Sequence, residues 1–335
     1  METVIISVCI SAYNGEVYLK RCLDSVISQD VASMEIILVD DGSTDGTLSI
    51  MHDYQERYPE IRIIRQKHSG LAQGRKTGVK NSTGEYVTFL DADDYLIEGA
   101  YKTIIQFMDN NKADIYEFQT EREGYLSKSP YTGIMNASRV LKDYFDGVGI
   151  PVNYWLRWYK RGLFSDQMFP VGISLYEDLY AFPCILSNAD RIAYIEKPLH
   201  THTKESKSSI MNSLYEDRNG KEYYERQKAL LLSIPHIESN IGADKLVAEY
   251  KEAFEHYKTN LFRSFVFIDV KGVSYREKLE AIISTLGLKM TPRELEKYIE
   301  QNINLNRKKN YAIRYIGLHN TYLLNTLVNR IRATT

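Results

Sequence analysis

Cysteine is scarce in this chain of 335 residues, which contains only Cys9, Cys22 and Cys184. Three widely spaced cysteines match neither a disulfide framework nor a zinc module, so we expect buried free thiols. A long apolar run is also missing near the start. The apolar stretch up to Ile10 is short, lacks a basic flank and is followed by polar residues. It is typical of neither a signal peptide nor a membrane span, so we expect a cytoplasmic protein.

An excess of charge of either sign is absent as well. The chain carries 42 Lys and Arg against 44 Asp and Glu, for a net charge of -2. This balance gives no reason to expect nucleic acid as a partner. Apolar residues at 44% and charged residues at 26% indicate a soluble globular protein of one or two domains. Tyrosine is abundant, with 26 copies, which suits sugar or base binding and also ordinary half-buried surfaces.

Three common ligand motifs are incomplete. No Gly-x-Gly-x-x-Gly follows the first apolar run, which disfavours a Rossmann dinucleotide fold. The segment 70–77 has Arg75 where a P-loop needs its second glycine. The segment 41–52 begins like a calcium loop but ends in His52 instead of a bidentate glutamate.

The first third of the chain alternates between strand and helix patterns. Strands are expected at 4–11, 35–39, 61–64, 86–90 and 113–118, and helices at 17–29, 47–58, 70–81 and 98–110. This alternation predicts right-handed crossovers and a mostly parallel sheet in an α/β fold. Ligands of such sheets lie beyond the carboxyl ends of the strands. Polar groups follow three of the predicted strands there, at 11–14, 40–43 and 91–94.

Asp91 and Asp93 form the most informative pair. Side chains two residues apart in extended chain point the same way, and converging carboxylates repel unless a cation or a proton holds them. Hard divalent cations choose such oxygen ligands and bridge to phosphate oxygens, which can activate a nucleotide leaving group. The alternative is an acidic turn that caps the helix starting near Glu98. The nearby acids Asp40 and Asp41 favour the metal interpretation.

Short motifs with regular spacing run from Val8 to Asp94. They are Ser-Ala-Tyr-Asn at 11–14, Tyr-Leu at 18–19, Cys-Leu-Asp-Ser-Val at 22–26, Gln29, the run at 37–46, Gly-Leu at 70–71, Arg75, Gly-Glu-Tyr at 84–86 and the run at 89–94. This series resembles the family 2 glycosyltransferases, inverting enzymes of the GT-A fold. A looser block at 155–209 resembles the acceptor side of the capsule and lipopolysaccharide branch, through 169–173 and 176–179.

The resemblance implies a donor site for a UDP-sugar. Ser11 and Tyr13 would line the base pocket, and Asp41 would accept a hydrogen bond from the N3–H of uracil. Asp91 would lie near the ribose, and Arg75 near the nucleotide or its phosphates. In place of the asparagine usual after that arginine the chain has Lys76, which either adds a cation near the diphosphate or is solvated.

The resemblance also implies a metal ligand and a base. Asp93 would bind Mn²⁺ or Mg²⁺ between itself and the diphosphate. Asp178 would take the proton of the acceptor hydroxyl, and an aspartate with an ordinary pKa of about 3.9 is already ionised at neutral pH. Glu177 and Asp178 are expected on extended chain, where they point in opposite directions and only one reaches the acceptor. The resemblance favours Asp178.

Four residues are candidates for the acceptor site. Trp155 and Trp158 are the only tryptophans, and their faces suit either a pyranose ring or the core. His200 and His202 stand where tyrosines are usual in the resembled family. They either supply a metal ligand or replace the tyrosines as packing or acceptor-site groups. With Glu177 from the acidic pair, the acceptor-site candidates are Trp155, Trp158, Glu177 and His202.

The chain is expected to divide near residue 215. A GT-A catalytic domain covers 1–215, with a nucleotide-sugar half at 1–118 and an acceptor half at 119–215, and a helical region covers 216–335. Helix patterns occur at 245–267, 275–286 and, after Pro292, 293–302. From 301 to the end there is no acidic residue and a charge of +6 among many apolar residues. This tail suits either the inner face of an anionic membrane or docking on the catalytic domain or a second subunit in a homo-oligomer.

The sequence thus predicts a metal-dependent, inverting glycosyltransferase in surface polysaccharide or glycoconjugate synthesis. It would move a sugar from a UDP-sugar to a glycan, lipid-linked or protein-linked acceptor. One alternative is a sugar nucleotidylyltransferase, which needs a glycine-rich basic loop that 11–16 lacks. Another is a non-catalytic sugar-binding or scaffolding subunit, which the intact Asp41, Asp91, Asp93 and Asp178 disfavour. Loops that no motif fixes decide the sugar, the acceptor and the linkage.

Overall fold

The computed structural model describes residues 5–122, 125–127, 129–173, 176–203, 220–268, 270 and 272–302. The chain divides into two compact units, one formed by 1–141 and 149–207 and the other by 142–148 and 208–335. We call them the sheet unit and the helical unit. The boundary expected near residue 215 falls outside the described residues and stays a prediction.

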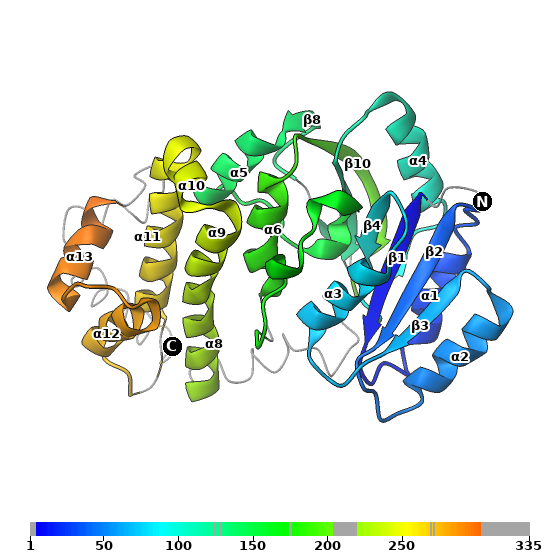
Figure 1. Cartoon of the computed structure of the whole chain (residues 1–335), viewed down its shortest axis with the longest axis horizontal. Coiled ribbons are helices and arrows are strands. Elements are labelled where there is room, and N and C mark those ends of the chain that lie inside the picture. The colour runs from blue at the N-terminus through cyan, green and yellow to red at the C-terminus, as the bar shows by residue number, and fades with distance from the viewer. Residues whose placement is uncertain are drawn as a thin grey trace. The chain divides into compact units, whose positions relative to one another are not determined.

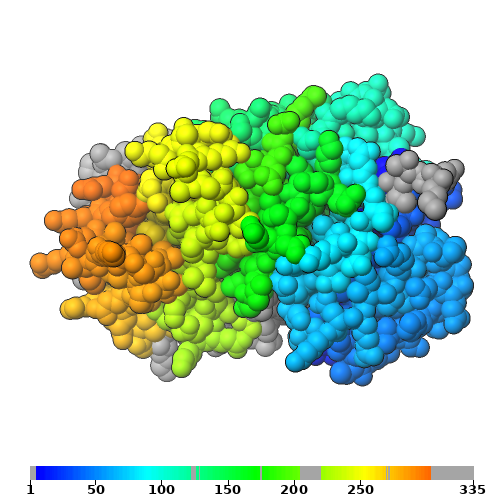
Figure 2. Space-filling view, viewed as in Figure 1, coloured from blue at the N-terminus to red at the C-terminus, as the bar shows by residue number. Residues whose placement is uncertain are grey.

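Four parallel strands form the first half of the sheet unit (Figure 1). They are β1 (Ile6–Ala12), β2 (Met34–Asp40), β3 (Ile61–Arg65) and β4 (Tyr86–Phe89), connected by α1 (Leu19–Ile27), α2 (Thr47–Arg57) and α3 (Leu71–Asn81). β1 pairs with β2 and β4, and β2 pairs with β3. The predicted α/β fold is therefore confirmed, and the strands of this half are all parallel, as predicted. The space-filling view shows side chains closing the gaps between these ribbons (Figure 2).

The second half of the sheet unit contains antiparallel strands that the sequence did not predict. β9 (Arg157–Lys160) lies antiparallel between β4 and β6 (Ile115–Arg122), and β10 (Arg191–Thr201) runs parallel to β6. The short strands β5 (Tyr95–Leu96), β7 (Tyr125–Ser127) and β8 (Gly133–Asn136) pair with β10, β6 and β10. The helices of this half are α4 (Ala100–Asn110), α5 (Ala137–Phe145), whose last residues belong to the helical unit, and α6 (Glu177–Ser187). Short 3-10 turns lie at Tyr154–Leu156, Arg161–Leu163 and Asp166–Met168.

The apolar runs explain the core of the sheet unit. β2 is buried along its whole length and β1 nearly so, as expected of strands covered on both faces. The three cysteines are free and buried, as predicted. α3 approaches β1 closely because it presents glycines to it. A Cβ at Gly74 would lie 2.0 Å from the hydroxyl oxygen of Ser11, and one at Gly78 would lie 2.9 Å from the Cβ of Cys9.

The described part of the helical unit consists of helices, as predicted. It is built from α8 (Lys221–Ala229), a 3-10 turn at Leu230–Leu232, α9 (Ser233–Ile241), α10 (Ala243–Glu249), α11 (Lys251–Phe267), α12 (Tyr275–Leu286) and α13 (Pro292–Gln301). The single helix expected at 245–267 is wrong, because the backbone leaves the helical conformation at Tyr250 and separates α10 from α11. Pro292 occupies the first turn of α13, as predicted, after a capping box formed by Thr291 and Glu294.

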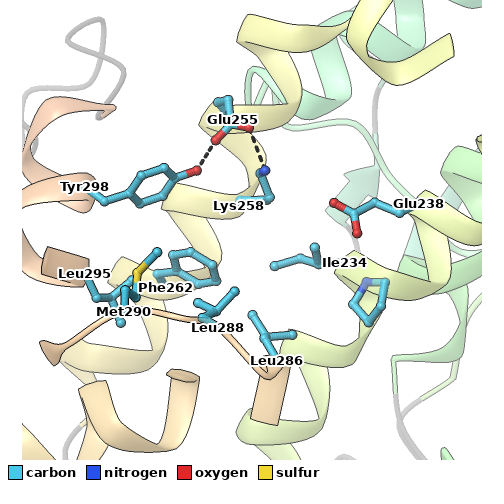
Figure 3. Close-up of a pocket in the computed structure, with 11 residues that line it drawn as sticks. Ile234, Glu238, Glu255, Lys258, Phe262, Leu286, Leu288, Met290, Leu295 and Tyr298 are labelled. Carbon is cyan, nitrogen blue, oxygen red and sulfur yellow. Dashed lines mark hydrogen bonds and ion pairs between the residues drawn. The ribbon is translucent and has the colours of Figure 1, made fainter. Parts of the chain in front are cut away.

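A cavity of about 250 Å³ lies within the helical unit. Apolar side chains such as Ile234, Phe262 and Leu288 line it, and at its edge Glu255 contacts Lys258 and Tyr298 (Figure 3). Among the described residues, no helix is long and apolar enough to span a membrane. The basic tail, for which membrane or protein contact is expected, lies outside the described residues from 303 onward.

A buried ion pair holds the antiparallel β9 to β6. The Arg157 side chain is fully buried, and its Nε donates to Glu117 at 2.8 Å while its guanidinium lies 4.2 Å from the ring centroid of Phe182. Burial raises the pKa of Glu117, although Arg157 opposes this rise. Removal of one partner would leave the other charge buried without compensation.

We therefore expect Arg157→Met to lower the free energy of unfolding of the sheet unit by about 3–5 kcal/mol. Adding Glu117→Leu in the same chain should recover part of this loss, because no charge is then left buried. The control is Lys160→Met on the same strand, since Lys160 is largely exposed and lies 3.5 Å from Asp114. That change should cost less than about 1 kcal/mol. Urea titrations monitored by tryptophan fluorescence measure all three, and equal losses for Arg157→Met and Lys160→Met would contradict the expectation.

Candidate functional site

The carboxyl ends of β1, β2 and β4 lie at one edge of the sheet. Ala12 pairs with Asp40, Cys9 pairs with Phe89, and the backbone N–H of Asp41 donates to the carbonyl of Ala12 at 2.9 Å. This register brings Ser11, Tyr13, Asp41 and Asp91 to the same edge, because each ends or follows one of these strands. The fifth predicted donor residue, Arg75, comes from α3. Ser11 is half-buried and faces Gly74 of α3, whereas Tyr13 keeps 48% of its surface exposed.

Asp41 anchors the loop that follows β3. Its carboxylate is almost fully buried and accepts hydrogen bonds from Gln66 Nε2 at 2.6 Å, from the N–H of Ser69 at 3.0 Å and from the N–H of Gly70 at 2.9 Å. The imidazole Nδ1 of His68 lies 2.9 Å from the same carboxylate. Sequence reasoning gave His68 no role, because it belongs to no motif that we considered.

Arg75 lies between the two predicted sides of the site. It is buried, and its guanidinium donates to Asp91 Oδ1 at 2.9 Å and to Glu177, and lies 4.7 Å from the ring centroid of Tyr154. Burial alone lowers the pKa of Arg75, but the carboxylates of Asp91 and Glu177 raise it above its ordinary value. Arg75 thus ties the end of β4 to the start of α6.

Lys76 is the next residue of α3, and it was expected either near the diphosphate or in solvent. Its side chain matches neither expectation fully. Its ammonium lies 3.6 Å from Asp166, which also pairs with Lys80 at 2.6 Å. The Lys76 side chain is 23% exposed, so it is partly solvated.

The expected extended conformation of Glu177 and Asp178 is wrong. Tyr176 adopts a left-handed conformation with φ of 61°, and both acids then form the first turn of α6. Acidic side chains are favourable at a helix N-terminus. Successive residues of a helix project about 100° apart, so the two carboxylates do not point in opposite directions. Glu177 is held by Arg75, and Asp178 lies beside it.

Asp178 has a strongly perturbed pKa. Its side chain is half-buried and surrounded by protein, so loss of water raises its pKa from 3.8 to about 7, with a further upward contribution from the Glu177 carboxylate. Arg75 opposes this rise but is already paired with Glu177 and Asp91. A carboxyl group with a pKa near neutrality is suited to accept and release a proton at physiological pH.

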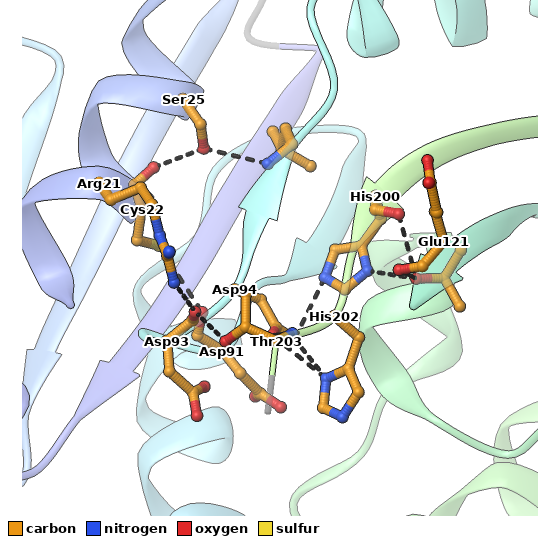
Figure 4. Close-up of polar contacts among 12 residues, drawn as sticks. Arg21, Cys22, Ser25, Asp91, Asp93, Asp94, Glu121, His200, His202 and Thr203 are labelled. Carbon is orange, nitrogen blue, oxygen red and sulfur yellow. Dashed lines mark hydrogen bonds and ion pairs between the residues drawn. The ribbon is translucent and has the colours of Figure 1, made fainter. Parts of the chain in front are cut away.

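Asp93 sits in a turn that two other segments hold in place. The carbonyl of Asp93 accepts from Arg21 Nη2 at 3.0 Å and from Thr203 Oγ1 at 2.8 Å. Figure 4 shows the carboxylates of Asp91 and Asp93 directed to the same side, away from His200. Burial raises the pKa of Asp93 to about 6, and the neighbouring Asp91 and Asp94 carboxylates add to the rise. A cation would relieve this repulsion.

The donor set fits a hard divalent cation that keeps most of its ligands outside the protein. In the described part of the chain, no three His, Cys, Asp or Glu side chains gather closely enough to hold a metal ion. Mg²⁺ in particular is commonly bound through one or two carboxylates, with phosphate and water oxygens completing its shell. Asp93 is the carboxylate expected in this role from the sequence, and it is directed to the same side as the carboxylate of Asp91.

Asp94 was missed by sequence reasoning, and it joins the turn to the end of β10. It is fully buried, and it accepts from His202 Nδ1 at 3.0 Å and from the N–H of Thr203 at 2.8 Å (Figure 4). His200 Nε2 lies 3.3 Å from the same carboxylate. Burial by itself raises the pKa of Asp94, but the two histidines outweigh it and lower the pKa to about 2.

The two tryptophans lie in different places: Trp155 packs against the histidines of this cluster, and Trp158 lies in the core. Trp155 stacks on His200 and His202, with centroid distances of 4.5 and 5.3 Å. Trp158 has no exposed surface and packs edge-on against Tyr101, so it presents no face to a sugar ring. Of the four acceptor-site candidates, the structure brings Trp155 and His202 together, buries Trp158 in the core and pairs Glu177 with Arg75.

This fold is the GT-A fold. The structure matches the crystal structure of S. aureus TarS residues 1–349 in complex with UDP-GlcNAc, with a TM-score of 0.70 and 21% sequence identity, covering 97% of this chain and 92% of that chain. Residues 7–159 match the family model of glycosyl transferase family 2.

Several proteins of similar sequence are named as glycosyltransferases. "Glycosyltransferase GlyA" of Streptococcus pneumoniae is 31% identical over 210 residues, which are 59% of this chain and 30% of GlyA. "Uncharacterized glycosyltransferase EpsJ" of Bacillus subtilis is 28% identical over 226 residues, 63% of this chain and 64% of EpsJ. "Poly(ribitol-phosphate) beta-N-acetylglucosaminyltransferase TarS" of Staphylococcus aureus is 25% identical over 292 residues, 82% of this chain and 46% of TarS. The chain therefore spans less than two-thirds of each of these relatives.

The Asp94 cluster gives a stability prediction. A carboxyl group whose native pKa lies below its unfolded value stabilises the fold above the unfolded pKa and loses that contribution as pH falls through the native pKa. For Asp94 these values are about 2 and 3.8. We expect Asp94→Asn to lower the free energy of unfolding by about 2 kcal/mol at pH 6. The difference from the unchanged protein should shrink as pH falls from 4 toward 2.

Asp109→Asn, at an exposed position of α4, is the matched control and should leave stability unchanged. Urea titrations at several pH values provide the measurement. A gap between Asp94→Asn and the unchanged protein that stays constant down to pH 2 would show that the charge of Asp94 contributes nothing.

Proposed function

We propose that this chain is an inverting glycosyltransferase that uses a UDP-sugar donor. It moves the sugar to a hydroxyl of a glycan, lipid-linked or protein-linked acceptor. The observation that carries the proposal is the continuous chain of contacts from Asp91 through Arg75 to Glu177, the residue that directly precedes Asp178 in α6. The UDP-GlcNAc in the matched TarS structure supports a UDP-sugar as donor.

The donor nucleotide lies along the carboxyl edge of β1, β2 and β4 in this proposal. Tyr13 offers an exposed ring to the base, Ser11 lines the same pocket, and Asp41 accepts from the base. Asp91 lies near the ribose, beside Arg75. Ligands of open α/β sheets bind at this edge, outside the carboxyl ends of the strands.

Asp93 is the proposed ligand for Mn²⁺ or Mg²⁺. A bound divalent cation neutralises charge that develops on the departing diphosphate. The contribution of the chain is to hold the carboxylate of Asp93 in place, through the contacts of Arg21 and Thr203 with its carbonyl. The unfavourable proximity of Asp91 and Asp94 favours cation binding at this position.

Asp178 is the proposed base. Inverting transfer is a single displacement at the anomeric carbon, in which the base removes the proton of the attacking hydroxyl. The guanidinium of Arg75 forms an ion pair with the carboxylate of Glu177. Asp178 is therefore the acid of this pair that is available to accept the proton. His202, with 27% of its side chain exposed, is the remaining acceptor-site candidate with accessible surface, and Trp155 supports it from below.

A panel of nucleotide sugars tests the metal and the donor together. In the presence of Mn²⁺, we expect release of UDP from a UDP-sugar and no release from a GDP-sugar. Asp93→Ala should abolish Mn²⁺-dependent UDP binding and turnover while the melting temperature stays within a few degrees. Asp109→Ala should behave like the unchanged protein. A scaffolding subunit would release no UDP, and full activity of Asp93→Ala or in excess EDTA would reject the metal assignment.

The second test concerns the base. Asp178→Asn keeps the size of the side chain and removes the proton acceptor, so transfer should fall by roughly 100-fold or more with little change in UDP affinity. Glu177→Gln is the matched neighbour and should retain more transfer than Asp178→Asn. In the unchanged protein kcat should rise with pH through about 7, because only the ionised Asp178 accepts the proton. An inactive, folded Glu177→Gln beside an active Asp178→Asn would show that the wrong acid is named.

A further inference from the structure

The exposed side chain of His68 makes contacts that suit a bound ligand better than a surface residue. The ring of His68 stacks on the ring of Tyr13, with centroids 4.0 Å apart and planes 26° apart. Its Nδ1 lies 2.9 Å from the carboxylate of Asp41 and is hydrogen-bonded to the backbone carbonyl oxygen of Asp41 at 3.2 Å. Asp41 is almost fully buried, whereas Tyr13 and His68 keep about half of their surface exposed. An aromatic face and a buried acceptor thus meet at the carboxyl edge of β1 and β2.

The imidazole matches the ligand that these two groups would select. Tyr13 offers its ring face to a flat heterocycle, and Asp41 selects a heterocycle with an N–H in its plane. A uracil ring has both properties, since its N3 carries a hydrogen. An imidazole with a proton on Nδ1 has the same two properties in a smaller ring.

We propose that His68 occupies the base subsite of the donor pocket in the donor-free protein and that uracil displaces its side chain. This inference rests on the proposed function, because it takes Tyr13 and Asp41 as the groups that bind the base. His68 then acts as a specificity-determining residue. Displacement of the imidazole breaks its ring contact with Tyr13 and its N–H contact with Asp41. Only a base that makes both contacts compensates for the interaction free energy that is lost.

The loop around His68 allows this displacement without a change of backbone. Its neighbours hold the loop independently, since Gln66, Ser69 and Gly70 donate to Asp41 and the N–H of Gln66 donates to the carbonyl of Asp40 at 2.9 Å. The side chain of His68 is 54% exposed. A rotation about its Cα–Cβ bond toward solvent therefore opens the face of Tyr13 and frees one acceptor position on Asp41, while the other three donors stay in place.

Competition of this kind lowers the apparent affinity for the base. When only a fraction of the protein has an open pocket, the measured Kd equals the intrinsic Kd divided by that fraction. A stack and a hydrogen bond at an exposed site keep the pocket closed for most of the time without locking it. Truncation of His68 should remove this competition, so we expect UMP to bind about three- to tenfold more tightly to His68→Ala.

Isothermal titration with UMP, without metal, measures the effect on the full chain. The expected result is a three- to tenfold lower Kd for His68→Ala than for the unchanged protein. Lys67→Ala, the exposed neighbour in the same loop, is the control and should leave the Kd unchanged. Tyr13→Ala should weaken binding whether or not His68 is present. CMP, whose N3 carries no hydrogen, should bind more weakly than UMP to both proteins.

A second measurement follows the side chain itself. In the free protein the proton on Cε1 of His68 should have an NMR frequency shifted by the ring of Tyr13, and Tyr13→Ala should remove this shift. Saturating UMP should remove it as well, because the imidazole leaves the stack.

The outcomes separate this inference from the proposed function. Weaker or unchanged UMP binding by a folded His68→Ala would overturn the displacement of His68, and the proposed UDP-sugar site would stand. UMP that binds neither protein would overturn the donor assignment itself, and the inference with it.

Discussion

The site depends on the ion pairs that the buried guanidinium of Arg75 forms with two carboxylates. The guanidinium lies between Asp91 at the end of β4 and Glu177 at the start of α6, two segments far apart in the sequence. A lone charge at this depth would be costly, and so would either carboxylate without it. The three groups therefore stabilise one another only when β4, α3 and α6 are all in place. In the proposed enzyme, this condition couples the geometry of the donor side to that of the base.

The electrostatics of the two proposed functional acids follow from this arrangement. Asp178 and Asp93 lie next to carboxylates that are already paired, Asp178 beside Glu177 and Asp93 between Asp91 and Asp94. Each of the two therefore has a raised pKa while its neighbours keep their partners. In the proposed enzyme, the paired acids stabilise the structure, and the charges of Asp93 and Asp178 remain available to the metal ion and the proton. Neither group could be assigned by residue type, since all are aspartate or glutamate.

The sequence predicted the parts of the fold that depend on local pattern. The strands of the first half lie within two residues of their apolar runs, because burial on both faces leaves a continuous signal. β9 gave no such signal, since it is four residues long, has a basic residue at each end and buries Arg157 against Glu117, a partner on another strand. The turn into α6 depends on the left-handed backbone conformation of Tyr176, which no sequence motif predicts. The partner of Asp94 lies 108 positions away at His202, beyond the reach of spacing arguments.

The glycines of α3 contribute to the site although they have no side chains. Gly74 and Gly78 let the helix lie against Ser11 and Cys9 at a distance that any Cβ would prevent. Arg75 follows Gly74 directly, so the same close approach sets how far the guanidinium reaches toward Asp91 and Glu177. In evolutionary terms, every replacement of either glycine adds a side chain and pushes the helix outward. This face of α3 should therefore resist drift as strongly as the acidic residues, although it takes no part in the chemistry.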